Sequence, residues 1–179
     1  EVLEKARKRA EEIIQEAEDM VPDPEVEDLE ASQAQAAGST AIAKLSDYIV
    51  VYEQERGLVI SFKDTLLFES GSDKLTPRAQ NIIKQVGGAL LGIPNYIRVE
   101  GHTDNLPINT GKFPSNWELS VLRASNVVHV LQEQASVPAE RLSIIGYGEY
   151  RPLAPNDDAL SRSMNRRVDI VILKKKYDY

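Results

Sequence analysis

The chain has 179 residues, of which 42% are hydrophobic, so it is long enough to bury one sizeable core. It contains no cysteine, which excludes disulfide bridges, thiolate metal sites and cysteine nucleophiles. Residues 1–37 hold 12 acidic and 4 basic side chains, whereas the other 142 residues hold 16 acidic and 17 basic ones. This nearly neutral remainder argues against nucleic acid as a partner, because proteins that bind a duplex usually carry a basic stripe.

The first twenty residues predict a helix, because they are rich in Glu, Lys, Arg and Ala. Apolar residues recur along this helix at helical spacing and form a narrow stripe: Val2, Leu3, Ala6, Ala10, Ile13, Ile14 and Ala17. Two interpretations of the stripe are open: a helix–helix contact, such as a short coiled-coil-like seam between two copies of the chain, and a solvated helix. Pro22 and Pro24 end the helix, and a linker follows. We therefore divide the chain into a leader helix with an acidic linker (1–38) and a main domain (39–179).

In the main domain the apolar pattern alternates between helix and strand. It predicts a helix over 40–48, a β-hairpin with strands over 49–53 and 58–62, and a helix that Thr76 caps and Pro77 opens. The elements that follow are a strand over 96–101, a loop over 104–115, a helix over 116–134, a strand over 142–146, a short helix over 157–163 and a strand over 167–174. This order predicts an α/β fold, a two-layer sandwich of βαβαβ type.

The most informative motif is Gly-His-Thr-Asp (101–104), which lies where a predicted strand runs into a loop. On the helix that follows, Asn116, Ser120 and Arg123 share one face because they are four and seven residues apart. A carboxylate, a guanidinium and neutral hydrogen-bonding groups together complement a zwitterion, with its ammonium on Asp104 and its carboxylate on Arg123. An equally open alternative is that Asp104 and Arg123 pair with each other and serve only the fold.

Four motifs in this order resemble the OmpA-like peptidoglycan-binding domain: Gly-His-Thr-Asp (101–104), Asn-x-x-Leu-Ser-x-x-Arg-Ala (116–124), Gly-Tyr-Gly (146–148) and Asn-Arg-Arg-Val (165–168). In that family, the Asp of the first motif and the Arg of the second hold the ammonium and the carboxylate of the diaminopimelate residue in the wall peptide. The resemblance therefore implies these roles for Asp104 and Arg123. We expect the same pocket to include Asn116, Leu119, Thr103, Ser120, Phe68, Ser70 and Arg166.

Two further segments are similar to one branch of this family, the B subunit of the flagellar motor stator in its proton-driven or sodium-driven form. They are Asn-Leu-Pro-Ile-Asn (105–109) and Phe-Pro-Ser-Asn-Trp-Glu-Leu-Ser (113–120), and the second lengthens the interval from Asp104 to Arg123 to 19 residues. The resemblance implies a homodimeric anchor that binds peptidoglycan outside the cytoplasm. It also implies a stator A subunit as partner, held through a transmembrane segment that is not recognisable in this sequence.

Two rival interpretations remain open. One is an OmpA-like anchor of another envelope complex, such as a lipoprotein or a secretion system. The other is a scaffold or dimerisation module in which the Asp104–Arg123 pair is structural. We expect no enzymatic activity, because Ser120 lacks a base partner and a guanidinium cannot accept a proton. No cofactor or metal is expected either, since His102 and Asp104 are fewer ligands than zinc requires.

Four residues have specific expectations. We expect His102 to brace the loop after its strand through hydrogen bonds. Trp117 is expected to pack into the core or a dimer interface rather than to stack on a sugar ring. Because side chains alternate along a strand, Arg166 and Arg167 should point to opposite faces, one toward the pocket and the other toward solvent.

Overall fold

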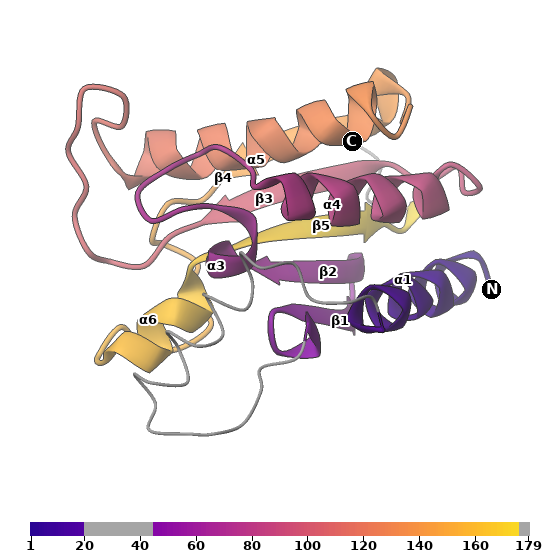
Figure 1. Ribbon diagram of the computed structural model, residues 1–179, viewed down its shortest axis with the longest axis horizontal. Coiled ribbons are helices and arrows are strands. Elements are labelled where there is room, and N and C mark those ends of the chain that lie inside the picture. Colours follow the sequence, from indigo (N-terminus) through magenta and orange to yellow (C-terminus); the bar gives the residue numbers. More distant parts are fainter. Residues whose placement is uncertain (20–44, 176–179) are drawn as a thin grey trace.

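The computed structural model describes residues 1–19 and 45–175, and its centre is a five-stranded sheet (Figure 1). The strands are β1 (Ile49–Gln54), β2 (Gly57–Lys63), β3 (Ile97–His102), β4 (Leu142–Gly146) and β5 (Arg167–Leu173). Their spatial order is β1-β2-β5-β3-β4, and β3 and β4 form the one parallel pair in this described sheet. The last strand of the chain is therefore the central one, and the predicted two-layer α/β fold is confirmed.

Three helices cover one face of the sheet: α1 (Val2–Glu18), α4 (Pro77–Leu90) and α5 (Asn116–Glu133) (Figure 1). α5 packs on β3 and β4, α1 contacts β1 and β2, and α4 contacts both other helices. Shorter elements connect these parts: η1 (Leu45–Asp47), α3 (Asp64–Leu67), η2 (Ala139–Arg141) and α6 (Ala159–Asn165). Apolar side chains from the helices and from the inner face of the sheet form one buried core.

Local signals in the sequence explain where several elements begin. Thr76 caps α4 as predicted, because its hydroxyl accepts a hydrogen bond from the Ala79 amide at 3.2 Å and Pro77 follows at the first helical position. The helix predicted over 40–48 is wrong for the described residues, which show only the short 3₁₀ turn η1. The strand begins directly after this turn, because Ile49 pairs with Phe62 in the hairpin and is therefore extended.

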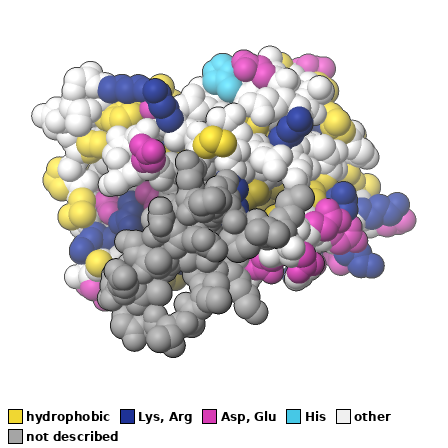
Figure 2. All heavy atoms as spheres, viewed as in Figure 1, with side chains coloured by type: hydrophobic (Ala, Val, Ile, Leu, Met, Phe, Trp, Pro, Cys, Tyr) yellow, Lys and Arg dark blue, Asp and Glu magenta, His cyan; other side chains and the backbone are white. Residues whose placement is uncertain are grey.

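The apolar stripe of α1 packs against the chain's own main domain. Its buried residues are Ala6, Ala10, Ile13, Ile14 and Ala17, and they join the same core as residues of α4 and η1. The solvated helix is therefore wrong, and the expected helix–helix contact is present with α4 as its partner, while a seam between two copies stays a prediction. Charged side chains of both signs gather over the outer side of α1 (Figure 2). The predicted boundary between residues 38 and 39 lies outside the described residues.

The opposite face of the sheet carries a buried ionic network. Glu100 on β3 accepts two hydrogen bonds from the Arg56 guanidinium, and Asp169 on β5 lies 3.1 Å from Arg167 Nε. Between these carboxylates stands His102, whose Nε2 is 3.8 Å from Glu100 and 3.6 Å from Asp169. Burial alone would raise the pKa of Glu100, but the contacts with His102 and Arg56 outweigh it and hold that pKa below its ordinary value. Both faces of the central strand β5 are thus buried.

Ile13→Ala tests the docking of α1 on the domain. The change removes fully buried atoms and leaves a cavity, so we expect the free energy of unfolding to fall by about 2–4 kcal/mol. Denaturant titrations at several protein concentrations measure the loss. The matched control Lys8→Ala, on the exposed side of the same helix, should change the free energy by less than about 0.5 kcal/mol. A difference between Ile13→Ala and the wild type that vanishes on dilution would instead indicate a seam between two copies.

Glu100→Gln tests how much the ionic network contributes to stability in acid. Because the pKa of Glu100 is lower in the folded chain than the ordinary 4.5, its charge adds stability that is present above that value and lost as the pH falls through the lowered pKa. At about pH 7 we expect the variant to be less stable than wild type by about 2–3 kcal/mol, and the difference to shrink below about pH 4. Thermal melting across this range measures both. A difference that stays constant with pH would contradict a contribution from the titrating charge of Glu100.

Candidate functional site

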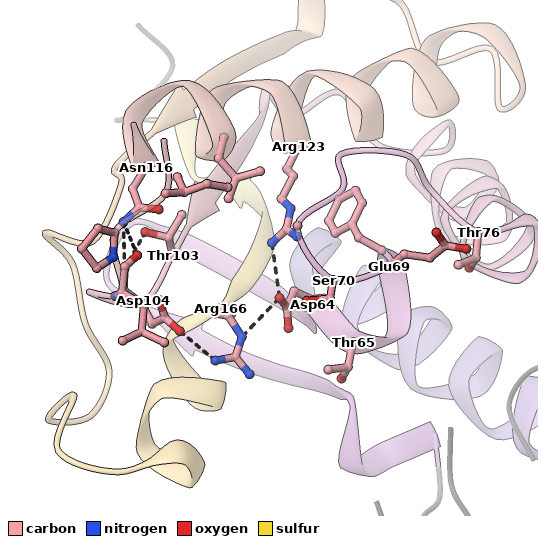
Figure 3. A pocket seen from close by; sticks show the side chains of 16 residues that line it. Asp64, Thr65, Glu69, Ser70, Thr76, Thr103, Asp104, Asn116, Arg123 and Arg166 are labelled. Carbon is pink, nitrogen blue, oxygen red and sulfur yellow. Dashed lines mark hydrogen bonds and ion pairs between the residues drawn. The ribbon is translucent and has the colours of Figure 1, made fainter. Parts of the chain in front are cut away.

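A pocket of about 690 Å³ opens where the carboxyl end of β3 meets the first half of α5 (Figure 3). Four parts of the chain line it: α3 and the loop after it, the loop after β3, one face of α5, and the residue before β5. The structure brings eight of the nine predicted site residues together here: Phe68, Ser70, Thr103, Asp104, Asn116, Leu119, Arg123 and Arg166. The strand-end motif and the helical motif therefore do converge, as the sequence predicted.

Ser120 is the one predicted site residue that does not line the pocket. It is fully buried, and its hydroxyl donates to the Trp117 carbonyl at 2.9 Å and accepts from the Gly148 amide at 3.1 Å. At this position α5 lies directly against β3: a Cβ added to Gly101 would stand 1.9 Å from the Ser120 carbonyl oxygen. Ser120 therefore faces the sheet, whereas Leu119, which was also predicted for the pocket, does line it.

Four charged side chains form an alternating chain across the pocket, which we call the charge quartet (Figure 3). Arg166 Nη1 lies 2.8 Å from Asp104 Oδ2, and Arg166 Nε lies 3.3 Å from Asp64 Oδ2. The same Asp64 oxygen is 3.3 Å from Arg123 Nη1. Asp104 and Arg123 therefore do not pair with each other, as one interpretation of the sequence had it, because each is paired with another residue. The quartet has two negative and two positive groups, so its formal charge is zero.

Arg123 reaches the quartet from α5 and is only 4% exposed. Its Nε donates to the Ser72 carbonyl at 2.9 Å, and the guanidinium carbon lies 4.7 Å from the centre of the Phe68 ring. Burial lowers the pKa of Arg123 below its ordinary value, and Asp64 opposes this change. The group still carries its charge, because a guanidinium is not deprotonated in proteins. The ring and the carbonyl therefore hold a permanent cation in one orientation at the wall of the pocket.

Asp104 is held by hydrogen bonds within the loop after β3. One carboxylate oxygen accepts from the Leu106 amide at 3.0 Å, and the backbone carbonyl of Asp104 accepts from the Thr103 hydroxyl at 2.8 Å. Asn116 Nδ2 donates to the Leu106 carbonyl at 3.0 Å and to the Asp104 carbonyl at 3.4 Å. Asn116 and Thr103 thus fix the loop, and the second Asp104 oxygen faces Arg166 across the pocket (Figure 3).

Asp64 is a charged residue of this pocket that the sequence interpretation missed. It is 9% exposed, and within the described part of the chain its Oδ1 atom is buried and accepts no hydrogen bond. Burial raises the pKa of Asp64 above its ordinary value, against the opposing charges of Arg123 and Arg166. In the sequence Asp64 follows a predicted strand and precedes an apolar run, which is a common place for an acidic residue at a helix start. That signal gave no reason to connect it with Asp104.

Among the described residues, one group of three could offer ligands to a metal ion: Glu100, His102 and Asp169, whose ligand atoms lie within 4.8 Å of one another. Both carboxylates already accept hydrogen bonds from Arg56 or Arg167, so a cation would compete there with two fixed positive charges. The expectation that His102 braces its loop is wrong: it faces this network and stacks on Tyr147 with ring centres 5.1 Å apart. Its ring nitrogens have no hydrogen-bond partner in the described part of the chain.

Two other expectations need correction. Trp117 does not enter the core, because it is 47% exposed and stacks on Tyr150 with ring centres 5.0 Å apart, while its place in a dimer interface stays a prediction. Arg166 and Arg167 do point to opposite faces, and Arg166 lines the pocket as expected. Arg167, however, is buried rather than solvated, because it pairs with Asp169 in the ionic network.

Comparisons with known proteins agree with this fold. Residues 67–166 match the OmpA family. Motility protein B of Bacillus subtilis is 37% identical over 150 residues, which cover 83% of this chain and 58% of that relative. The chain therefore spans little more than half the length of this relative.

Solved structures give the same result. The periplasmic domain of Helicobacter pylori MotB is 32% identical with a TM-score of 0.66, covering 71% of this chain and 82% of that one. The cell wall anchor of the T6SS from Pseudomonas aeruginosa is 29% identical with a TM-score of 0.66, covering 80% and 94%. No helix in residues 1–19 or 45–175 has both the length and the apolar character to cross a membrane. The match over residues 67–166, the shared fold and these relatives show that the chain belongs to the OmpA family.

Proposed function

We propose that this chain is a non-catalytic domain that binds the stem peptide of peptidoglycan and anchors a flagellar motor stator to the cell wall. The observation that carries the proposal is the pair of opposite charges held at two sides of one pocket, Asp104 on the loop after β3 and Arg123 on α5. Both side chains are more than nine-tenths buried and both are fixed by neighbours. A ligand with one ammonium and one carboxylate on the same end fits such a site.

The distal end of diaminopimelate has this chemistry, because one carbon atom carries both an ammonium and a carboxylate. We assign the ammonium to Asp104 Oδ2, the atom of that carboxylate which faces the pocket, and the carboxylate to the Arg123 guanidinium. Leu119 and Phe68 supply apolar walls for the methylene chain between the two ends of the amino acid. The charged side chains of the pocket form ion pairs. We therefore expect the pocket to bind its ligand without changing it chemically.

The stator role rests on the likeness to Motility protein B of Bacillus subtilis and to the periplasmic domain of Helicobacter pylori MotB. It brings further proposals: a location outside the cytoplasm, a homodimer, and a stator A subunit reached through a membrane segment. A single site of few charge-assisted hydrogen bonds binds weakly, and two linked copies on one wall polymer would bind far more strongly.

A second candidate function is the anchoring of another envelope complex. The observation that favours it is the likeness to the cell wall anchor of the T6SS from Pseudomonas aeruginosa, which covers 80% of this chain. The two candidates share the wall-binding step and differ in the attached machinery. Deletion of the gene separates them: cells that build flagella but do not swim support a stator, and unchanged swimming supports another complex.

Asp104→Asn and Arg123→Gln test the wall-binding step. Each change removes one charge that the ligand needs, so we expect each variant to bind purified peptidoglycan sacculi at least about tenfold more weakly than wild type. Co-sedimentation with sacculi measures the binding, and thermal melting checks that each variant is folded. The control Asp157→Asn removes the same charge from an exposed loop outside the pocket and should bind like wild type. A wild-type chain that stays in the supernatant would contradict the proposal.

A further inference from the structure

We infer that Asp64 is the exchange partner of the pocket: it holds Arg123 and Arg166 while the pocket is empty, and it releases Arg123 but keeps Arg166 when a zwitterionic ligand binds. The inference rests on the proposed function, because it describes how the same pocket accepts its ligand. It adds a role for a residue outside the sequence motifs, and it predicts how the pocket selects its ligand by charge.

In this structure, two of the chain's own side chains occupy the places proposed for the ligand's charges. The Arg166 guanidinium lies 2.8 Å from Asp104, where the ligand ammonium would bind. The Asp64 carboxylate lies 3.3 Å from Arg123, where the ligand carboxylate would bind. Arg166 and Asp64 are also 3.3 Å from each other (Figure 3). They therefore form an internal substitute for a zwitterion, with its cation on Asp104 and its anion on Arg123.

Because of this arrangement, a ligand can enter without leaving any buried charge alone. Before binding, the quartet has three ion pairs: Asp104–Arg166, Arg166–Asp64 and Asp64–Arg123. After the exchange there are again three: the ligand ammonium with Asp104, the ligand carboxylate with Arg123, and Arg166 with Asp64. The last pair exists already, so it needs only to strengthen. Burying an unpaired charge is strongly unfavourable, and the exchange avoids it.

Asp64 has the free bonding capacity that this exchange requires. Its backbone is fixed at the start of α3, since its amide donates to the Arg166 carbonyl at 3.1 Å and its carbonyl accepts from the Phe68 amide at 2.8 Å. Its Oδ2 atom serves both arginines, whereas its buried Oδ1 atom accepts no hydrogen bond in the described part of the chain. When Arg123 turns to the ligand, Arg166 can bind both oxygens as a fork. The Arg166 side chain is 29% exposed, so it has room to move.

Asp64 therefore also sets the preference of the pocket for ligand charge. Replacing Asp64 by Asn frees Arg123 from its competitor and makes the quartet positive by one unit. Both effects favour a ligand carboxylate. The same change leaves Asp104 as the one acidic partner that the quartet offers Arg166, so an incoming ammonium must strand that guanidinium and also meets extra positive charge. In Asp64→Asn, the affinity for a ligand carboxylate should thus rise and the affinity for a ligand ammonium should fall.

The test uses three soluble peptides that share the stem L-Ala-γ-D-Glu and differ in the third residue. Meso-diaminopimelate carries both distal charges, L-lysine carries the ammonium alone, and 2-aminopimelate carries the carboxylate alone. With Asp64→Asn we expect the 2-aminopimelate peptide to bind about tenfold more tightly and the lysine peptide about tenfold more weakly than they bind wild type. The diaminopimelate peptide should change by less than about threefold. Isothermal titration calorimetry gives the three dissociation constants for each protein.

Asp157→Asn is the matched control. Asp157 is exposed in a loop outside the pocket, and the change makes the same replacement of Asp by Asn without touching either arginine of the quartet. Because an exposed charge is screened by water and salt, we expect its variant to alter the ratio of lysine to 2-aminopimelate affinity by less than about threefold. If Asp64→Asn changes this ratio no more than Asp157→Asn does, the inference is overturned although the proposed function stands. If wild type binds none of the peptides, the proposed function and the inference fail together.

A second variant covers the case in which Asp64→Asn does not fold. Arg166→Gln removes the internal competitor for Asp104 and lowers the charge of the quartet by one unit. The inference predicts that the lysine peptide binds this variant several-fold more tightly than wild type. If Arg166 instead served as a second clamp for the ligand carboxylate, the lysine peptide would be unaffected and the 2-aminopimelate and diaminopimelate peptides would both lose affinity. That result would overturn the exchange.

Discussion

The close contact between β3 and α5 determines the geometry of the pocket. Gly101 allows the Ser120 backbone to lie against the strand, at a distance that no side chain at 101 would permit. Three residues beyond this contact on each element come Asp104 and Arg123, so both charges are placed relative to one fixed point. The loop between β3 and α5 can then vary in length and composition without changing the distance between them, because its two ends are held by the contact and by Asn116.

The need to pair every buried charge explains the rest of the site. Asp104 and Arg123 are both deeply buried, and neither could remain so in an empty pocket without a counter-ion. The chain supplies these counter-ions from two other places, Asp64 after β2 and Arg166 before β5. Those two residues are joined through their backbones as well as through their side chains. The pocket therefore depends on how three strands are arranged, since Asp64 follows β2, Asp104 follows β3 and Arg166 precedes β5, while Arg123 comes from α5.

The sequence identified most of the pocket because the motifs are local. Asp104 follows a strand, Arg123 lies on a strongly patterned helix, and both positions could be placed from periodicity and from the resemblance. Asp64 could not be found this way, because its role depends on the antiparallel pairing of β2 with β5, a contact between residues more than one hundred positions apart. The same limit explains why the sequence did not predict where α1 packs. Its apolar stripe was evident, but the surface that covers it is built from α4 and the β1–β2 hairpin, and periodicity does not name a partner.

Errors at single residues have a common physical origin. His102 and Arg167 were expected near loops or solvent because polar side chains usually are. In the structure the outer face of the sheet is itself buried and ionic, so both residues lie among opposite charges. The expected core position of Trp117 was wrong in the opposite sense, since the sequence does not distinguish an exposed ring stacked on Tyr150 from a buried one. Alternation tells which side of a strand a residue occupies, and the environment of that side comes only from the tertiary structure.

The docking of α1 also has a mechanical consequence. The N-terminus and the loop that carries Asp104 lie toward opposite ends of the molecule's long axis (Figure 1). A tension applied between residue 1 and a wall-bound pocket would therefore run along the sheet and reach it through the α1 contact. That contact would be loaded in shear over five buried residues at once, together with the hydrogen bond from the Ser46 amide to Glu18. Contacts loaded in this way give way together rather than one residue at a time, so the buried residues of α1 would resist such a tension as a unit.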